Sequence, residues 1–267
     1  MKILVIPDIH SRNFWRKTVD DYISEVSKII FLGDYLDLYP EELEYAPELI
    51  ECRDFYDAQS NLNILNDIIS LKKNKPNKYI LLTGNHTDSY IWSNFNAATR
   101  TDNKNWEKYH KFFSQNLEYF NLVWIENNTI FSHAGISEGW AEAVAVELSL
   151  TINLNNPIIK SIAKYLFNIN LNNISDKKFI ELLGDISYYR EGSSYYGSCE
   201  WADLREHINH YQTEVQEKIV PLGEDGIYQV FGHTQLKAPL ITDKWACLDC
   251  RQGFIFDTET YDCKSCL

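Results

Sequence analysis

The chain has 267 residues, of which 45% are hydrophobic and 14% aromatic. This is enough apolar mass for a full core, and it excludes disorder as the main state. The formal net charge of −13 argues against a broad basic face for duplex nucleic acid, because that mode of binding needs clustered Lys and Arg. A small phosphorylated substrate, or a local basic pocket for a nucleic-acid end, remains compatible with this charge.

No segment of the chain reads as a targeting signal or a membrane anchor. The first apolar run, Ile3 to Pro7, ends at Asp8 and is much too short for the core of a signal peptide or for a membrane span. No other segment reaches spanning length without charges. We therefore expect no membrane partner, and we expect the protein in the cytoplasm, where thiols stay reduced.

Short apolar runs, each ending in a loop with Asp, Asn or His, recur along the chain. Each run is predicted to be a buried strand, and the runs are Lys2–Pro7, Lys28–Leu32, Tyr79–Thr83, Thr129–Ser132 and Tyr228–Phe231. In layered α/β folds, ligands gather beyond the carboxyl ends of the strands. The repetition therefore predicts an α/β fold in which these loops meet at one place.

The segments between these runs have apolar residues at helical spacing. Helices are predicted within Glu41–Lys73, Trp106–Phe120, Ser137–Leu183 and Trp201–Val220. The third segment breaks near Asn155-Asn156-Pro157 and carries none of the strand-end motifs. We interpret residues 137–185 as a helical cap inserted into a single domain that spans residues 1–267. Trp245–Phe256 is predicted to form a pair of strands.

Four of the six cysteines have a spacing that resembles a zinc site of four thiolates. They are Cys247, Cys250, Cys263 and Cys266, in the order C-L-D-C and C-K-S-C. Two features weaken this interpretation. Residues three apart on a strand face opposite sides, and neither pair has the Gly or Pro that usually shapes a zinc turn. We favour ordinary buried or tail thiols and keep a structural zinc as the alternative.

The polar residues at the strand ends form an ordered set of short motifs. In chain order they are Asp8-x-His10, Gly33-Asp34-x-x-Asp37, Gly84-Asn85-His86, His133 and Gly232-His233. Each motif alone is weak, but the ordered set resembles the calcineurin-like metallophosphoesterase superfamily. The stretch from Phe131 to Gly135 is similar to the histidine motif of one branch, which includes phosphoprotein phosphatases and dinucleoside-tetraphosphate hydrolases.

This resemblance implies a four-layer α/β sandwich of two mixed β-sheets flanked by helices. It also implies two divalent or trivalent ions, and carboxylate and imidazole ligands suit Mn, Fe or Zn. By resemblance, Asp8, His10 and Asp34 bind the first metal. Asp34 bridges to the second, which also takes Asn85, His133 and His233. A metal-bridging hydroxide would then attack the phosphorus atom.

The resemblance also implies roles for two residues beside the metals. His86 would contact the phosphate together with Asn85, and it would protonate the departing oxygen as a general acid. Asp37 would pair with His86 and hold its orientation.

The chain departs from the pattern of the family at three positions. Gln235 stands where many members have a further metal-binding His, and Thr87 replaces the usual acidic residue after the third motif. Leu38 stands where the branch has an Arg that clamps the phosphate. Arg190 and Arg205 are the candidates to replace it, whereas Arg53 and Arg100 are expected to be surface charges.

We therefore expect a phosphomonoesterase that acts on a nucleotide, a phosphorylated nucleic-acid end or a phosphoprotein. A phosphodiesterase or dinucleoside-polyphosphate hydrolase with the same metal core is the first alternative. A metal-free scaffold of the same fold is the second, but the complete ligand set argues against it.

Overall fold

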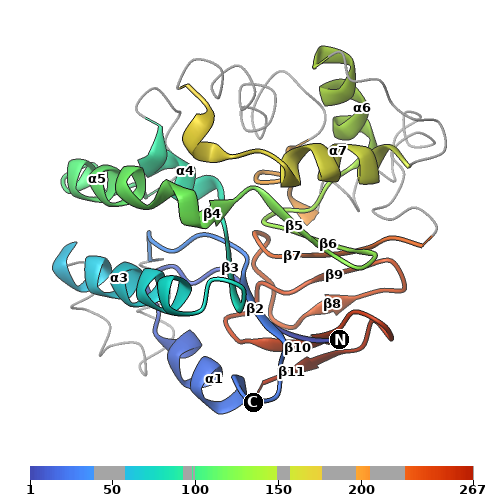
Figure 1. The fold of residues 1–267 in the computed structure, drawn as a ribbon, viewed down its shortest axis with the longest axis horizontal. Coiled ribbons are helices and arrows are strands. Elements are labelled where there is room, and N and C mark those ends of the chain that lie inside the picture. The colour runs from blue at the N-terminus through green and yellow to red at the C-terminus, as the bar shows by residue number, and fades with distance from the viewer. Residues whose placement is uncertain are drawn as a thin grey trace.

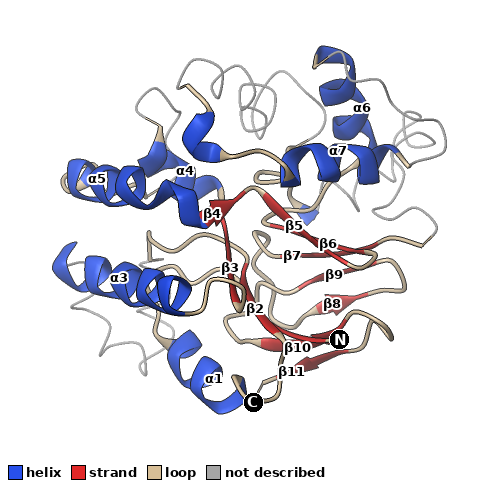
Figure 2. Ribbon diagram, viewed as in Figure 1, coloured by secondary structure: helices blue, strands red, loops and turns tan. Residues whose placement is uncertain are grey.

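The computed structural model describes residues 1–38, 58–92, 98, 100–148, 157–175, 197–204 and 226–266. Two β-sheets form the centre of this structure, and helices lie outside them (Figures 1 and 2). Both sheets combine parallel and antiparallel pairs. The predicted α/β fold, with two mixed sheets flanked by helices, is therefore confirmed.

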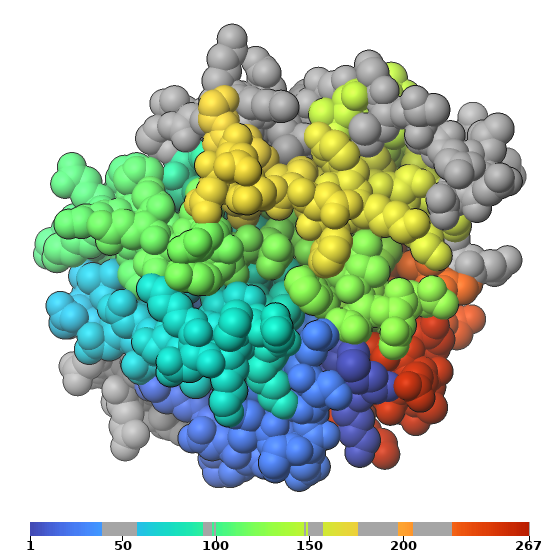
Figure 3. All heavy atoms as spheres, in the orientation of Figure 1, coloured from blue at the N-terminus to red at the C-terminus, as the bar shows by residue number. Residues whose placement is uncertain are grey.

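The first sheet has the strand order β11-β10-β1-β2-β3-β4. Its parallel part is made of β1 (Lys2–Ile6), β2 (Lys28–Phe31), β3 (Tyr79–Leu82) and β4 (Phe120–Asn121). The antiparallel strands β10 (Phe254–Asp257) and β11 (Cys263–Ser265) extend it on the side of β1. The first and last segments of the chain consequently lie side by side, as the blue and red atoms of Figure 3 show.

The second sheet has the strand order β5-β6-β7-β9-β8. Its parallel centre consists of β6 (Thr129–Ser132), β7 (Tyr228–Phe231) and β9 (Trp245–Cys247). The antiparallel strands β5 (Val123–Glu126) and β8 (Leu240–Ile241) form its edges. Because β1, β2, β3, β6 and β7 each precede one of the polar motifs, the two sheets supply five loops to one region.

The five strands predicted before the polar motifs are confirmed to within one residue at their ends. The two strands predicted within Trp245–Phe256 are found as β9 and β10, but they do not pair with each other. β9 pairs with β7 and β8 in the second sheet, whereas β10 pairs with β1 and β11 in the first. Residues 248–253 carry the chain from the second sheet to the first, where β10 pairs with β1 at the other end of the chain.

The inner faces of the two sheets pack against each other in one hydrophobic cluster. Val5, Ile30 and Leu82 of the first sheet meet Phe131 and Val230 of the second, and all five side chains are buried. Residues of β1 to β3 on the opposite face belong to a second cluster with the helices. This alternation explains why the predicted strands are almost entirely apolar, since both faces are covered.

The helices cover the outer faces. On the first sheet lie α1 (Phe14–Tyr22), α3 (Ala58–Asn74) and α5 (Trp106–Asn116), and the short helix α4 (Asn85–Ile91) packs against α5. The predicted helices within Glu41–Lys73 and Trp106–Phe120 are found as α3 and as α5 with the 3₁₀ turn η2 (Leu117–Tyr119). Residues 41–57 lie outside the described part.

Two further helices, α6 (Glu138–Glu147) and α7 (Ile158–Phe167), follow the second sheet strand β6. The Ser137 side chain accepts a hydrogen bond from the Trp140 N–H and caps α6. α7 begins directly after Pro157, at the predicted break, and packs against β5 and α6 (Figure 1). A 3₁₀ turn, η3 (Leu171–Asn173), follows. That these helices form an inserted cap of a single domain stays a prediction.

The cysteine side chains do not converge as a four-thiolate site requires. Cys247 lies on the outer face of the second sheet, where its thiol donates to the carbonyls of Gly232 and Thr234. Cys250 and Cys263 pack into the cluster between the sheets, and Cys266 packs into the cluster under the helices. Among the described residues, the side-chain groups close enough to hold a metal ion include none of these cysteines, so the favoured interpretation as ordinary thiols is retained.

Among the described residues, no helix combines the length and the apolarity that crossing a membrane demands.

Gly253, directly before β10, lies against Thr18 of α1. A Cβ atom added there would lie 2.5 Å from Thr18 Cγ2 of α1 and 3.2 Å from Ile6 Cδ1. We expect Gly253→Ala to lower the free energy of unfolding by about 1–3 kcal/mol, the usual cost of overpacking. Urea denaturation measures this change. Thr18→Ser removes the clashing methyl group, so the same glycine substitution should cost clearly less in that background; an equal cost in both would contradict the packing account.

Candidate metal centre

The loops after five strands bring together the residues of the predicted motifs. Asp8 and His10 follow β1, Asp34 follows β2, Asn85 begins α4 after β3, and His133 and His233 follow β6 and β7. All but His233 are at most 3% exposed, and His233 is partly buried. The parallel strands of two sheets therefore deliver these side chains to one buried region.

The carboxylate of Asp34 occupies the centre of this region. Its Oδ1 atom accepts the backbone N–H of His86 at 3.0 Å, which fixes it to the first turn of α4. Its Oδ2 atom lies 3.3 Å from His133 Nε2 and 3.8 Å from His10 Nε2. Two groups of side chains that could hold a cation share this residue, one with Asp8 and His10 and the other with His133 and His233.

Hydrogen bonds to backbone carbonyls set the orientation of two imidazoles. His10 Nδ1 lies 2.8 Å from the Leu36 carbonyl, and His133 Nδ1 lies 2.9 Å from the Leu32 carbonyl. A carbonyl only accepts, so in both rings Nδ1 carries a proton and Nε2 is the ring nitrogen that faces the centre. Histidines that bind metals are usually held in this way.

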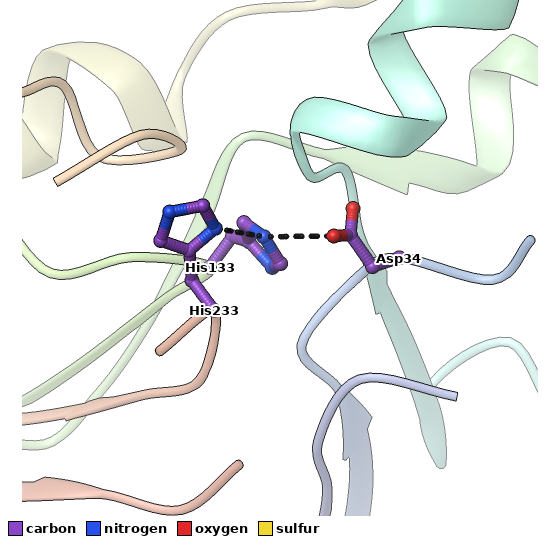
Figure 4. Close-up of side chains that lie close together, drawn as sticks. All are labelled: Asp34, His133 and His233. Carbon is purple, nitrogen blue, oxygen red and sulfur yellow. Dashed lines mark hydrogen bonds and ion pairs between the residues drawn. The ribbon is translucent and has the colours of Figure 1, made fainter. Parts of the chain in front are cut away.

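The second group surrounds His133. Its Nε2 atom lies 3.0 Å from Asn85 Oδ1 and 3.2 Å from His233 Nδ1, and His233 Nδ1 is 3.1 Å from the same Asn85 oxygen. Figure 4 shows the side chains of Asp34, His133 and His233 pointing toward one another from different loops. Nitrogen and oxygen atoms that can donate lone pairs to a metal ion crowd together here, and a cation between them would stabilise this arrangement.

The backbone approaches these side chains as closely as glycine allows. A Cβ atom on Gly232 would lie 2.2 Å from Asp8 Oδ2, and one on Gly84 would lie 2.5 Å from Asp34 Oδ1. The His233 N–H donates to both oxygens of Asp8 at 3.1 Å. The glycines of the third and fifth motifs are therefore needed for close contact with the two carboxylates.

Several residues of the centre have left-handed backbone conformations, which side chains other than glycine rarely adopt. His10, Asp34, Asp37 and His233 have φ angles of 43°, 46°, 66° and 64°. Such conformations cost free energy and occur preferentially at functional sites, where the surrounding structure enforces them.

The buried charges shift one another's protonation. Burial raises the pKa of Asp8 to about 6, although His133 opposes the shift. Burial also favours the neutral form of Asp34, but the neighbouring His133, His86 and His10 outweigh it and hold its pKa below the ordinary value. Burial disfavours the charged form of His133, yet Asp34 and Asp8 raise its pKa to about 10. The carboxylates thus attract positive charge into a largely buried site.

His86 lies at the edge of the centre and is held by Asp37. Asp37 Oδ2 accepts a hydrogen bond from His86 Nδ1 at 2.7 Å, and Asp37 Oδ1 accepts one from the Tyr90 hydroxyl. The ring of His86 lies 5.0 Å from that of His10, centroid to centroid. Burial is the main cause that raises the pKa of Asp37, while its bonds to His86 and Tyr90 oppose the shift. The expected pairing of Asp37 with His86 is present.

Two residues of this region were not singled out from the sequence. Arg12 follows His10 by two positions; its side chain is 4% exposed, and Nη1 lies 3.4 Å from the Asp8 carbonyl. Tyr90, four residues after His86 on α4, holds Asp37. The spacing of Tyr90 on the helix was a usable signal, because residues four apart share one helix face.

Arg190 and Arg205, the expected phosphate-binding arginines, lie outside the described residues. Arg53 lies outside them as well. Arg100 was expected to be a surface charge, and this expectation is wrong. Its guanidinium is partly buried, and Nη2 lies 3.3 Å from His86 Nε2. Ala98 and Asp102, on either side of Arg100, are hydrogen-bonded to Ser89 and Tyr90 of α4 and place the side chain beside His86. Gln235, which was left out of the ligand set, is exposed.

Comparison with solved structures shows likeness of the fold. The crystal structure of a cold-active protein-tyrosine phosphatase of a psychrophile, Shewanella sp., has a TM-score of 0.51 at 16% identity, over 99% of this chain and 80% of that chain. A protein serine/threonine phosphatase from Saccharomyces cerevisiae with similarity to human phosphatase PP5 has a TM-score of 0.48 at 13% identity, over 100% of this chain and 80% of that chain. No curated protein matches the chain.

The match to a family is more extensive. The model of the family described as calcineurin-like phosphoesterase matches residues 1–235, which include every strand-end motif described above. Members of this family depend on two metal ions, and the Asp and His groups around Asp34 offer the ligand types that such ions need. The chain therefore belongs to the calcineurin-like phosphoesterase family and is a metal-dependent hydrolase of phosphate esters.

Proposed function

We propose that the protein is a phosphomonoesterase that holds two cations around Asp34 and uses His86 as its general acid. The observation that carries this proposal is the position of Asp34 in both groups of candidate ligands. Asp8, His10 and Asp34 hold the first cation. Asp34, Asn85, His133 and His233 hold the second. Mn, Fe or Zn suits this set of carboxylate, imidazole and amide ligands.

The side chains present fit such ions. The ligand atoms of the Asp and His side chains in each group lie within 4.8 Å of one another, and in His10 and His133 the backbone carbonyls hold Nδ1 and leave Nε2 facing the centre. When bound, the two cations lower the pKa of a water molecule and screen the charge of the phosphate. Asp34, fixed at Oδ1 by the N–H of His86, keeps the two ligand groups next to each other.

His86 and Asn85 bind the phosphoryl group on the adjoining side. Asp37 keeps the His86 proton on Nδ1 and turns Nε2 toward the centre. Nε2 then contacts the phosphate and, once protonated, donates a proton to the departing oxygen. The Tyr90 hydroxyl donates to Asp37 Oδ1, the oxygen that does not contact His86. This bond fixes Asp37, so that His86 keeps its orientation during the reaction.

A nucleotide, a phosphorylated nucleic-acid end and a phosphoprotein are the substrate classes that we keep. A phosphodiesterase or dinucleoside-polyphosphate hydrolase on the same core is the alternative. The buried cluster argues against a metal-free scaffold, since uncompensated buried charges destabilise a fold without serving it. The free thiols of five described cysteines support a reducing, cytoplasmic location.

Metal removal should abolish the activity. We expect chelation to stop hydrolysis of p-nitrophenyl phosphate and Mn²⁺ to restore it, because the cations supply the activated water. Asp34→Asn should reduce kcat more than about 100-fold. This exceeds the usual effect of replacing a residue that only hydrogen-bonds to a metal ligand, because Asp34 is proposed to be a ligand itself. Steady-state kinetics and metal analysis of the same samples measure both effects. Full activity of the chelated protein would refute the proposal.

Metal affinity should rise with pH. Below about pH 6 the Asp8 carboxyl binds a proton, since burial raises its pKa to about 6, and this proton competes with the cation. His133, whose pKa is raised to about 10, must also lose its proton on binding. Calorimetric titration with Mn²⁺ between about pH 5 and pH 8 should show tighter binding at the higher pH, with proton release. An affinity that does not change with pH would contradict this account.

The role of His86 depends on the leaving group. We expect His86→Asn to lower kcat about 10²–10⁴-fold on an alkyl phosphate. The loss on p-nitrophenyl phosphate should be far smaller, because nitrophenolate leaves without a proton. Asp37→Asn should also lower kcat more on the alkyl phosphate than on p-nitrophenyl phosphate, but by smaller factors, since it only misorients the acid. Equal losses on the two substrates would count against the acid role.

A further inference from the structure

The described residues on both sides of Arg100, Ala98 and Asp102, are hydrogen-bonded to α4. Before Arg100, the Ala98 N–H donates to Ser89 Oγ at 2.8 Å. After it, the Asp102 N–H donates to the Tyr90 hydroxyl oxygen at 2.7 Å. Both anchors lie on the helix that begins with Asn85 and His86, and Tyr90 is the residue that fixes Asp37. These residues are thus connected to the same hydrogen bonds that orient the proposed general acid.

Arg100 itself has a left-handed backbone, with a φ of 67°. A non-glycine residue adopts this conformation at a cost in free energy, and it persists where the surroundings enforce it. The Thr101 hydroxyl closes the turn by donating to the Ala98 carbonyl at 2.7 Å. The turn directs the side chain inward, where Arg100 Nη2 comes within 3.3 Å of His86 Nε2.

The two side chains approach each other at the atom that the proposed function assigns to the phosphate. Asp37 holds His86 Nδ1, so Nε2 is the ring nitrogen that faces away from the carboxylate. A guanidinium beside this nitrogen places a permanent positive charge at the outer edge of the candidate metal centre. An oxyanion that contacts Nε2 would also lie within reach of the Arg100 N–H groups.

We propose that Arg100 binds the phosphoryl group of the substrate beside His86. It takes the role of the phosphate-clamping Arg of the family branch, whose position in the second motif is occupied here by Leu38. This inference rests on the proposed function. Arg suits the role because its planar guanidinium donates two parallel hydrogen bonds to neighbouring phosphate oxygens, and Lys provides only a point charge.

The position of Arg100 also favours one class of ester. A phosphate monoester carries about −1.5 to −2 charge near neutral pH and three strong acceptor oxygens. A diester has one negative charge and lacks the third terminal oxygen. An additional fixed cation beside His86 therefore increases binding of monoesters more than that of diesters, so Arg100 deepens the assignment as a phosphomonoesterase.

The test compares Arg100→Asn and Arg100→Lys with the unsubstituted protein. Asn tolerates the left-handed backbone, so it removes the guanidinium without adding strain. Arg16→Asn on α1 is the matched control, because Arg16 is an exposed residue that pairs with Asp67. All proteins are loaded with Mn²⁺, and their metal content is measured. Titration calorimetry then gives the affinity for inorganic phosphate, and kinetics gives kcat/KM for p-nitrophenyl phosphate and its bis ester.

We expect Arg100→Asn to weaken phosphate binding about 10- to 100-fold, the usual effect of a lost hydrogen bond between charged groups. Its kcat/KM should fall more for the monoester than for the bis ester. Arg100→Lys should recover part of both losses, and Arg16→Asn should change neither.

Phosphate binding within about twofold of the unsubstituted protein in both Arg100 variants would overturn the inference and leave the proposed function standing. An equal loss of kcat/KM on the two esters would overturn the preference for monoesters. If the unsubstituted, metal-loaded protein neither binds phosphate nor hydrolyses an ester, the proposed function fails, and the inference fails with it.

Discussion

The rest of the site depends on how the Asp34 carboxylate is held. One of its oxygens is tied to the His86 N–H, and the other faces the imidazoles of His10 and His133. The backbone carbonyl of Asp34 in turn accepts the N–H groups of Ile9 and His10. The loops after β1, β2 and β3 are therefore joined through one residue, and a shift of this carboxylate would separate the two groups of candidate ligands.

The cluster around Asp34 is costly for the fold without cations. Two carboxylates and several imidazoles are almost completely removed from water, and unpaired buried charges destabilise a protein. Left-handed conformations at His10, Asp34, Asp37 and His233 add strain. Two extensively packed sheets on either side compensate for these costs. Buried charges and strained backbone conformations are expected at residues that serve function and not stability.

Much of the site could be predicted because it depends on short-range patterns. Each apolar run that precedes a motif folds as a strand, and the residue after it necessarily lies at the strand end. The arrangements that the sequence did not predict depend on tertiary contacts. β9 and β10 separate into different sheets, because β9 joins β7 and β10 joins β1. Arg100 comes close to His86 where Asp102 is hydrogen-bonded to Tyr90 of α4, and no periodicity encodes this contact.

The most direct test of this account is anomalous diffraction from crystals of the full chain grown with Mn²⁺. The account predicts two strong peaks on either side of the Asp34 carboxylate, one near Asp8 and His10 and the other near Asn85, His133 and His233. A single peak, or peaks away from Asp34, would contradict the claim that this residue joins two cation sites.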